Sequence, residues 1–516
     1  MKLIKKYSLE IFSLPVLICV YLFTRLIAIL SIPIFTDEAI YTRWAQIARF
    51  DSNWRFISLT DGKQPSFIWL DVLVMKIVDD PLLAGRLVSV GAGLLTAVGV
   101  YFLAYELFKK IDTKKSRIIG IISSLIVVLF PFSLVYDRLA IYDSLVAAFF
   151  VWALYFQIRL VRTLRFDSAM VLGFILGGAV LTKSIGFLSI YLTPFLLLLL
   201  EFNKKTFKVR ILKFVIYAGI ATVMAYGMYA ILRLSPFFHI IAEKNLIFVQ
   251  SPEEWLKLQH IDKYKTFISS TRGLVDWFVS YFTIPYIVLV VVSFFINPKL
   301  LREKTVLLLW FILPFLSLCV FGKTLYPRYI LFMVMPLIPL VAFSIFFLLA
   351  KYKSLVVRSV IVGISLITPL YMNYFILFDF SKAPIPKLDL EQYINGWPAG
   401  GGVAESVNYF KEQSKKGPIF IATQGTFGLM PAAYEIYLLG NKNVTIKGYW
   451  PTNEAIPEEI IQIAKEKPTY FVFYQDCQLC SFPGDAPDTW SLDKVASFKK
   501  GAGDTYLTIY RVKNEQ

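Results

Sequence analysis

The sequence predicts a multi-pass α-helical membrane protein that ends in a soluble α/β domain. The 516-residue chain is 57% hydrophobic and only 17% charged, and its mean hydropathy is +0.62. Its apolar residues come in blocks of roughly 18 to 25, the length that crosses a bilayer. The composition becomes that of a soluble protein after about Ser381. We therefore expect a membrane domain over 1–380 and a second domain over 381–516.

The first apolar block follows basic N-terminal residues and has no small-residue cleavage site, so we expect a retained helix with a cytoplasmic N-terminus. The later blocks predict ten more spans, about eleven in all, near 82–108, 117–136, 140–158, 168–182, 184–201, 211–233, 277–296, 305–321, 329–350 and 355–378. Five connecting loops rich in Lys and Arg then fall on the cytoplasmic side. The net charge of +17 therefore indicates orientation in a cell membrane and excludes nucleic acid as a partner.

The C-terminal region alternates between helical and strand patterns. Helical patterns cover 404–416, 430–440 and 457–467, and strand patterns cover 417–425, 443–450, 469–476 and 505–512. This alternation predicts a small α/β domain on the outer face of the membrane. Within it, Cys477 and Cys480 favour a local disulfide over a metal site, because no second Cys or His pair accompanies them.

The first outer loop, from about Ser31 to Ser66, holds two adjacent acids. Thr36 can cap a helix whose first turn contains Asp37 and Glu38, and Tyr41 shares a face with Asp37. The acids could merely complement the helix dipole. Apolar residues at helical spacing indicate a helix lying on the membrane surface, apolar face down: Ile40, Trp44 and Ile47.

Charged residues also interrupt the apolar runs further along. Asp137, Arg138 and Asp143 belong to the second outer loop, and Lys183 separates two later blocks. Charges at such positions are functional candidates by default. Asp137 and Arg138 could instead form a structural ion pair, Asp143 could cap a helix, and Lys183 could extend to lipid head groups.

Together the outer loops present carboxylates, cations and phenols. This set suits transfer of a group from a phosphate leaving group. A carboxylate could accept a proton from the acceptor, and the cations could stabilise charge on the departing phosphate. The candidates are Asp37, Glu38 and Asp143, then Lys63, Lys183 and Arg328, then Tyr41 and Tyr329.

The ordered motifs resemble a known family. "TDEAIYTRWAQIA", "GKQPSFIWL", "AIYDSLVAAFF" and "LTKSIGFL" are similar to segments of the GT-C glycosyltransferases of the protein O-mannosyltransferase and aminoarabinose transferase type, with a weaker echo in "YPRYILFMVMPLIPL". The resemblance implies a GT-C fold and an envelope enzyme that takes sugar from a polyprenyl-phosphate donor. It places the active site on the outer face of the membrane.

The resemblance also implies roles for particular residues. Asp37 matches the first-loop aspartate that serves the acceptor or acts as base, and Asp143 matches the second-loop aspartate. The lipid phosphate would be held by Tyr41, Lys63 and Tyr329, and we add Arg138, Lys183, Arg272 and Arg328 as candidate ligands. Some relatives carry an acid directly before the lysine, where a divalent metal can bind, but residue 62 here is Gly. We assign no metal ligand and no certain cofactor, although a divalent metal is possible.

A lipid, a glycan or a protein could accept the sugar. The alternative function is a transporter or lipid flippase with an outer sensing domain. It would favour broken or charged mid-membrane helices and inverted repeats, whereas the ionisable groups here concentrate at the outer interface.

Overall fold

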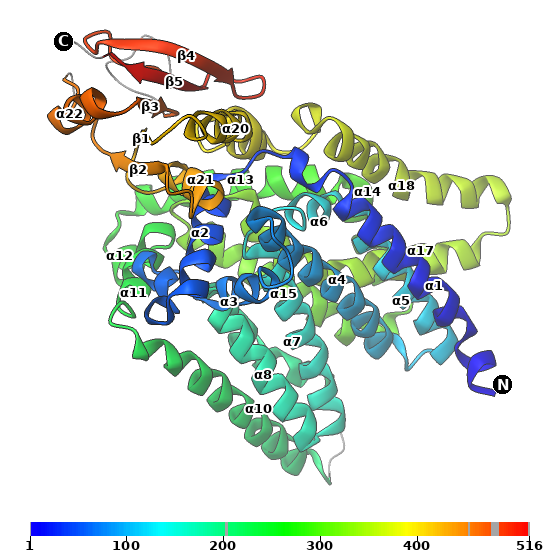
Figure 1. The fold of residues 1–516 in the computed structure, drawn as a ribbon. Coiled ribbons are helices and arrows are strands. Elements are labelled where there is room, and N and C mark those ends of the chain that lie inside the picture. Colours follow the sequence, from blue (N-terminus) through cyan, green and yellow to red (C-terminus); the bar gives the residue numbers. More distant parts are fainter. Residues whose placement is uncertain (1, 202–204, 453–454, 476–483, 514–516) are drawn as a thin grey trace. The chain divides into compact units, whose positions relative to one another are not determined.

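The computed structural model describes residues 2–201, 205–452, 455–475 and 484–513 (Figure 1). These residues form two compact units. Unit 1 comprises 1–27, 55–70 and 87–377, and unit 2 comprises 28–54, 71–86 and 378–516. One unit boundary, at Phe378, lies close to the domain boundary predicted near residue 380. The predicted disulfide at Cys477 and Cys480 lies outside the described residues.

Unit 1 is built from helices. Its longer helices are α1 (Lys2–Leu26), most of α4 (Pro81–Phe108), α5 (Thr113–Leu129), α7 (Asp143–Thr163), α8 (Phe166–Thr182), α10 (Phe207–Ala230), α13 (His260–Phe282), α14 (Ile284–Phe295), α15 (Leu301–Phe321), α17 (Ile338–Lys351) and α18 (Leu355–Phe378). Short helices connect them: η3 (Ile57–Asp61), α6 (Pro131–Tyr136), η4 (Ser184–Gly186), α9 (Phe187–Tyr191), η5 (Thr193–Leu199), η6 (Ile231–Leu234), α11 (Ile240–Phe248), α12 (Pro252–Lys257), η7 (Pro298–Leu300), η8 (Pro327–Ile330), α16 (Leu331–Val334) and η9 (Met335–Leu337). Helix α3 (Ser66–Val74) is shared between the two units.

The predicted multi-pass membrane architecture is confirmed. Among the described residues, seven helices are long and apolar enough to cross a membrane, or eight if a bent pair is one span. The remaining predicted spans coincide with shorter elements: α5, α8 and the stretch from η4 to η5. Burial separates the spans into two classes. In Pro327–Lys351, 89% of an 18-residue apolar window is buried, whereas in α18 and in Phe207–Leu234 only 17% is buried. The former span is therefore packed within the protein, and the latter two leave most of their apolar window uncovered by protein.

The predicted span 277–296 is not one helix. Helix α13 ends at Phe282 and α14 begins at Ile284, and the two meet at 91°. Pro285 lies in the first turn of α14. Proline has no backbone N–H to donate, so it suits the start of a helix but cannot continue the preceding one. The apolar pattern alone did not reveal this break.

Helices α7, α8 and α10 pack side by side in unit 1 (Figure 1). Helix α8 carries small residues at these contacts. A Cβ on Gly173 or Gly177 would come within 2.8 or 2.2 Å of methionine sulfur atoms on α10. Glycine therefore allows the two backbones to approach closely, as is common between membrane helices.

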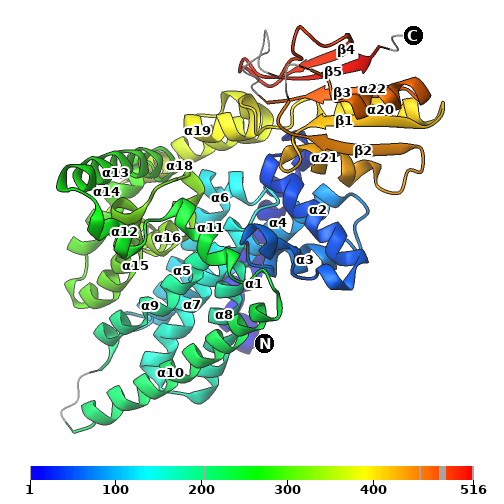
Figure 2. The same cartoon turned by 90° about the vertical axis from the view of Figure 1, so that its left-hand side faces the viewer.

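Unit 2 contains the predicted α/β domain. Its five-stranded sheet has the order β2-β1-β3-β5-β4, with strands β1 (Ile419–Gln424), β2 (Val444–Tyr449), β3 (Thr469–Phe473), β4 (Leu492–Lys499) and β5 (Tyr506–Val512) (Figure 2). Strand β1 pairs in parallel with β2 and β3, and β5 pairs antiparallel with β3 and β4. The helices of this domain are α20 (Val403–Ser414), α21 (Leu429–Leu438) and α22 (Glu458–Glu466). Four strands and three helices match predicted segments, whereas β4 was not predicted.

Residues 28–54 fold into unit 2 as well. Unit 2 also contains η1 (Ile29–Ser31), α2 (Thr36–Phe50), η2 (Ser52–Trp54), η10 (Phe380–Lys382), α19 (Lys387–Leu390) and the π-helical turn η11 (Glu391–Asn395). Helix α2 packs against α21. Ile40 and Trp44 are only 7% and 5% exposed, so protein covers the apolar face that we expected to lie on the membrane surface.

Candidate active site

In unit 1, Asp143 and Lys183 form an ion pair. Asp143 begins α7, and Lys183 follows the end of α8 in an extended conformation. The Lys183 Nζ donates to Asp143 Oδ1 at 2.9 Å, and the side chains are 27% and 8% exposed, respectively. The Lys183 ammonium also lies 4.7 Å from the centre of the Tyr329 ring. Lys183 therefore contacts Asp143, 40 positions earlier in the chain, and Tyr329, nearly 150 positions later.

Lys183 and Tyr329 border a cavity of about 360 Å³. Lys63, Gln64, Lys183, Lys244 and Tyr329 all line it. The loop that carries Lys63 is fixed to the start of η4, because Gln64 Nε2 donates to Ser184 Oγ at 2.7 Å. Lys63, Lys183 and Tyr329, three of the predicted site residues, thus belong to one cavity.

The rest of the cavity wall is apolar. Helix α15 contributes Pro314, Leu318 and Phe321 at helical spacing, and α9 contributes Phe187 and Leu188. Phe248 of α11 lies between the two regions, since its ring centre is 5.1 Å from the Lys63 Nζ and 6.2 Å from the Tyr329 ring. The cavity therefore has cationic and hydrogen-bonding groups together with a hydrocarbon-like surface.

Lys244 is a cation of this cavity that the sequence analysis missed. Its Nζ donates to Asp61 Oδ1 at 2.5 Å. Gly62, between Asp61 and Lys63, has φ +66°, and a Cβ there would lie 2.5 Å from Lys244 Cβ and 2.6 Å from Ile240 O. Position 62 thus excludes the acidic side chain that holds a metal in some relatives. Among the described residues, no three His, Cys, Asp or Glu side chains gather as a metal site.

The predicted arginines lie in three different settings. The guanidinium carbon of Arg328 is 5.0 Å from the Tyr326 ring centre and 5.9 Å from that of Tyr329. Arg138 is fully buried and donates to the carbonyls of Ile27 and Ile376 at 2.9 and 3.2 Å. Arg272 is exposed on α13 and is absent from the lining of the cavity that holds Lys183.

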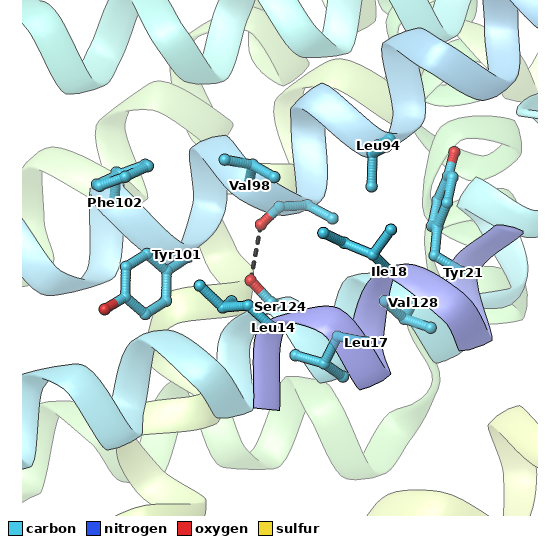
Figure 3. A pocket seen from close by; sticks show the side chains of 11 residues that line it. Leu14, Leu17, Ile18, Tyr21, Leu94, Val98, Tyr101, Phe102, Ser124 and Val128 are labelled. Atoms are coloured by element: carbon cyan, nitrogen blue, oxygen red, sulfur yellow. Dashed lines mark hydrogen bonds between the residues drawn. The ribbon is translucent and has the colours of Figure 1, made fainter. Parts of the chain in front are cut away.

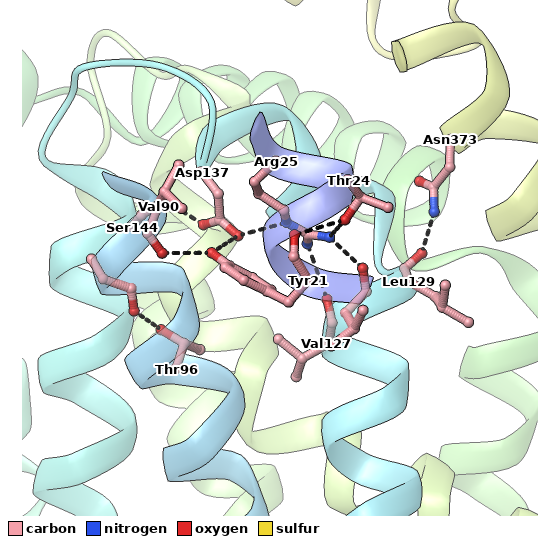
Figure 4. Close-up of polar contacts among 12 residues, drawn as sticks. Tyr21, Thr24, Arg25, Val90, Thr96, Val127, Leu129, Asp137, Ser144 and Asn373 are labelled. Carbon is pink, nitrogen blue, oxygen red and sulfur yellow. Dashed lines mark hydrogen bonds and ion pairs between the residues drawn. The ribbon is translucent and has the colours of Figure 1, made fainter. Parts of the chain in front are cut away.

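Asp137 belongs to a buried network near the start of α7 (Figure 4). Arg25 of α1 pairs with its Oδ2 at 3.4 Å, and Tyr21 donates to the same oxygen at 3.1 Å. Ser144, the residue after Asp143, donates to Oδ1 at 2.7 Å. Arg25 is thus a cation at Asp137 that the sequence analysis did not identify. The network ties α1 to the first turn of α7 and therefore fixes the backbone that carries Asp143.

A smaller cavity of about 60 Å³ lies between α1, α4 and α5 (Figure 3). Its lining is almost wholly apolar. The Ser124 hydroxyl at its edge donates to the carbonyl of Ala97 at 2.7 Å. Because this polar group is already satisfied within the protein, the cavity offers no reactive group.

Three predicted residues from the start of the first loop, Asp37, Glu38 and Tyr41, belong to unit 2, whereas Lys63 belongs to unit 1. Phe35, not Thr36, is the N-cap of α2, and Thr36 Oγ1 instead donates to the carbonyl of Pro398 at 2.8 Å. Asp37 is partly exposed in the first turn, and Tyr41 is 4% exposed with its ring 5.7 Å from that of Trp44.

Glu38 has a different environment from Asp37. It is fully buried and accepts two hydrogen bonds from Arg86, at 2.9 and 2.8 Å, and one from the backbone of Phe35 at 3.0 Å. Arg86 also donates to the carbonyls of Ile32 and Pro33. The carboxylate of Glu38 thus already accepts three hydrogen bonds within the protein. The geometry therefore favours a structural role for Glu38 over the catalytic role that we predicted.

Comparisons with known proteins show which family pattern and which solved structures this chain resembles. Residues 63–229 match the sequence model of the dolichyl-phosphate-mannose-protein mannosyltransferase family. No curated protein matches the chain. Among solved structures, ArnT from Cupriavidus metallidurans in the apo state is 14% identical, with a TM-score of 0.57 and 99% of each chain covered. The same protein bound to undecaprenyl phosphate is 14% identical, with a TM-score of 0.54 and 98% of each chain covered.

An archaeal protein has the same architecture. The oligosaccharyltransferase AglB from Archaeoglobus fulgidus, in complex with an inhibitory peptide and a dolichol-phosphate, is 11% identical, with a TM-score of 0.52; the match covers 91% of this chain and 69% of that one. At these identities the likeness establishes the fold. The predicted fold and resemblance are confirmed: the chain has the GT-C glycosyltransferase fold, and residues 63–229 carry the mannosyltransferase family pattern.

Proposed function

We propose that the protein is a membrane glycosyltransferase that takes a sugar from a polyprenyl-phosphate donor. The observation that carries the proposal is the cavity of about 360 Å³ in unit 1, where Lys63, Lys183 and Lys244 accompany an apolar wall. A polyprenyl phosphate has the matching division between an anionic head and a hydrocarbon tail. The family pattern over residues 63–229 supports the same reaction class.

The charges of the cavity suit a lipid monophosphate. Three lysines line it, and Asp143 and Asp61 each pair with one of them. Ammonium groups beside an apolar wall attract the single negative charge of a phosphodiester between lipid and sugar. When the sugar leaves, the phosphate gains a second negative charge. The ammonium groups therefore bind the transition state more tightly than the ground state, as catalysis requires.

The proposed reaction is a single displacement at the anomeric carbon. The acceptor oxygen or nitrogen forms a bond to this carbon while the bond to the phosphate oxygen breaks, and that oxygen keeps the electron pair. The acceptor proton passes to a carboxylate, for which we propose Asp37 on the basis of its sequence motif. Lys63 and Lys183 hold the departing phosphate, with Tyr329 beside Lys183. Asp143 holds Lys183, and one displacement inverts the sugar configuration.

The membrane orientation belongs to the same proposal. The five loops rich in Lys and Arg indicate a cytoplasmic N-terminus, which puts the second loop with Asp143 and the C-terminal domain outside the cell. The lipid donor would then be used on the outer face of the membrane. The acceptor there is a lipid, a glycan or a protein.

The test is donor discharge by the purified protein. A panel of radiolabelled polyprenyl-phosphate sugars is incubated with the wild type and with Lys63→Ala and Lys183→Ala. Lys257→Ala is the matched control, since Lys257 is 74% exposed and pairs with Glu253 in its own helix. We expect one labelled donor to be discharged by the wild type and the control, and far more slowly by the other two. Failure to discharge any donor would contradict the proposal and favour a transporter.

A further inference from the structure

Unit 2 contains a second, larger cavity of about 500 Å³. Residues 30–34 form one wall, and the start of α4 forms another with Leu82 and with Asp80, the residue before the helix. Residues 400–402 and one face of α20 form the remainder, joined by Tyr437 of α21. The volume lies within the range of roughly 300–1,000 Å³ that small-molecule sites occupy.

The walls of this cavity are fixed by buried contacts. Arg86 and Glu38 form the buried ion pair described above, and Arg86 binds the carbonyls of residues 29, 32 and 33. Phe35 forms a β-bridge with Ala399. A Cβ on Gly400 would lie 2.2 Å from the carbonyl oxygen of Ile34, so only glycine permits this approach. The cavity is thus preformed, which lowers the ordering cost of binding.

One face of α20 supplies polar groups to the cavity. Glu405, Asn408 and Lys411 recur every three residues and line it, while Ser406 and Phe410 on the same helix are buried away from it. In the part of the chain that the structure describes, these three polar side chains make no hydrogen bond or ion pair with other protein groups. A carboxylate, an amide and an ammonium group therefore remain available for a ligand.

Tyr437 adds a phenol to the opposite wall. Burial, followed by the nearby Asp80 carboxylate, raises the pKa of this phenol above its ordinary value. The hydroxyl therefore keeps its proton across the physiological range and offers a hydrogen-bond donor. Tyr437 is partly buried, and among the described residues its hydroxyl has no protein acceptor, so it can donate to a ligand.

The charges argue against an anionic ligand. Asp80 and Glu405 carry two negative charges against the single positive charge of Lys411. The glycines of the turn are explained by packing, since a Cβ on Gly402 would lie 2.6 Å from Phe498 Cβ. The carboxylates beside this turn would repel a phosphate group. Closely spaced acceptors and donors instead suit vicinal hydroxyl groups, and the apolar wall with Ile32 and Leu82 suits the C–H face of a sugar ring.

We propose that this cavity binds a neutral sugar unit, at a site separate from the lysine-lined cavity of unit 1. Glu405 accepts hydrogen bonds from the sugar hydroxyls, and Tyr437 donates one. Asn408 does both. If the chain is a glycosyltransferase, the natural occupant is a sugar of a glycan acceptor, but the binding site itself does not depend on that activity.

Direct binding tests the proposal on the full-length protein. The probes are the methyl glycosides of mannose, glucose and arabinose, followed by saturation-transfer NMR and titration calorimetry in a detergent without a sugar head group. Glu405→Ala removes the carboxylate, and Glu412→Ala is its matched control because Glu412 lies on the same helix but pairs with Lys415. We expect at least one glycoside to bind the wild type and Glu412→Ala equally. Glu405→Ala should bind it roughly tenfold more weakly, and Asn408→Ala roughly fivefold.

Three results would overturn the proposal: no glycoside binds the wild type, Glu405→Ala binds as well as Glu412→Ala, or inorganic phosphate displaces the glycoside. Thermal melting of each variant confirms that its fold is intact. Because binding is read without sugar transfer, this test can fail while donor discharge succeeds, and the reverse.

Discussion

The pair between Asp143 and Lys183 gives the sharpest test of the lysine-lined cavity. The two charges are 2.9 Å apart. With an effective dielectric constant of roughly 20, their attraction is about 6 kcal/mol before desolvation is counted. Lys183 is 27% exposed, so solvent screening and the desolvation of both groups reduce the measurable coupling to about 1–3 kcal/mol.

The effect on catalysis follows from the role of Lys183. If its ammonium binds the departing phosphate, Lys183→Ala removes a charged hydrogen bond worth about 1.5–3 kcal/mol. The transition state then loses a factor of roughly 10 to 150 in kcat/KM. Asp143→Asn leaves Lys183 in place but less well oriented, so we expect a smaller loss, roughly tenfold. The double variant should be no slower than Lys183→Ala alone, because Asp143 acts through Lys183.

The assay is donor discharge by the purified variants at several donor concentrations, so that kcat and KM are separated. Each variant is first checked for normal membrane insertion and melting. Additive losses in the double variant would show that Asp143 acts independently of Lys183 and would refute the proposed arrangement. Wild-type turnover by Lys183→Ala would remove the lysine from the mechanism.

Three further predictions concern single residues. Asp37→Asn should abolish sugar transfer while donor binding and membrane insertion stay normal. If this variant transfers sugar at the wild-type rate, Asp37 is not the base. Glu38→Gln should destabilise the protein by about 3–5 kcal/mol, because it leaves Arg86 buried without its full counter-charge, and an unchanged melting temperature would contradict this. Gly62→Ala should weaken donor binding by displacing Lys244, whereas the exposed Gly219→Ala, with open space around its Cβ, should not.

The sequence predicted the elements that repeat a strong local pattern. Apolar blocks located the membrane helices, and alternating patterns located β1, β2, β3 and β5 of the C-terminal sheet. Strand β4 was missed because it is amphipathic, with much of its length exposed and charged residues at Asp493 and Lys494. The break at Thr283 was missed because the residues around it are apolar, and only Pro285 marked it.

The sequence predicted the site residues that lie beside a recognisable motif. It did not predict contacts between residues that the fold brings together from distant parts of the chain. Lys63, Lys183 and Tyr329 were found from the sequence, since each interrupts or borders an apolar run. Their shared cavity was only a hypothesis, because no local pattern tells which distant loops meet. Arg25 and Arg86 carried a usable signal, a charge inside an apolar block, which is paired by default. Their partners, Asp137 and Glu38, could not be derived without coordinates.

The contacts of α2 show that, within unit 2, the C-terminal region supports a helix from near the start of the chain. Arg43 pairs with Glu435 at 2.6 Å, and Gln46 donates to the carbonyl of Ile436 at 3.0 Å. With the hydrogen bond from Thr36 to Pro398, three contacts along α2 reach residues beyond 390. A helix whose apolar residues are covered in this way would expose them if the C-terminal region were removed. The orientation of Asp37 therefore depends on residues nearly 400 positions away, and a truncated chain that kept every proposed site residue would still lose the support of its proposed base.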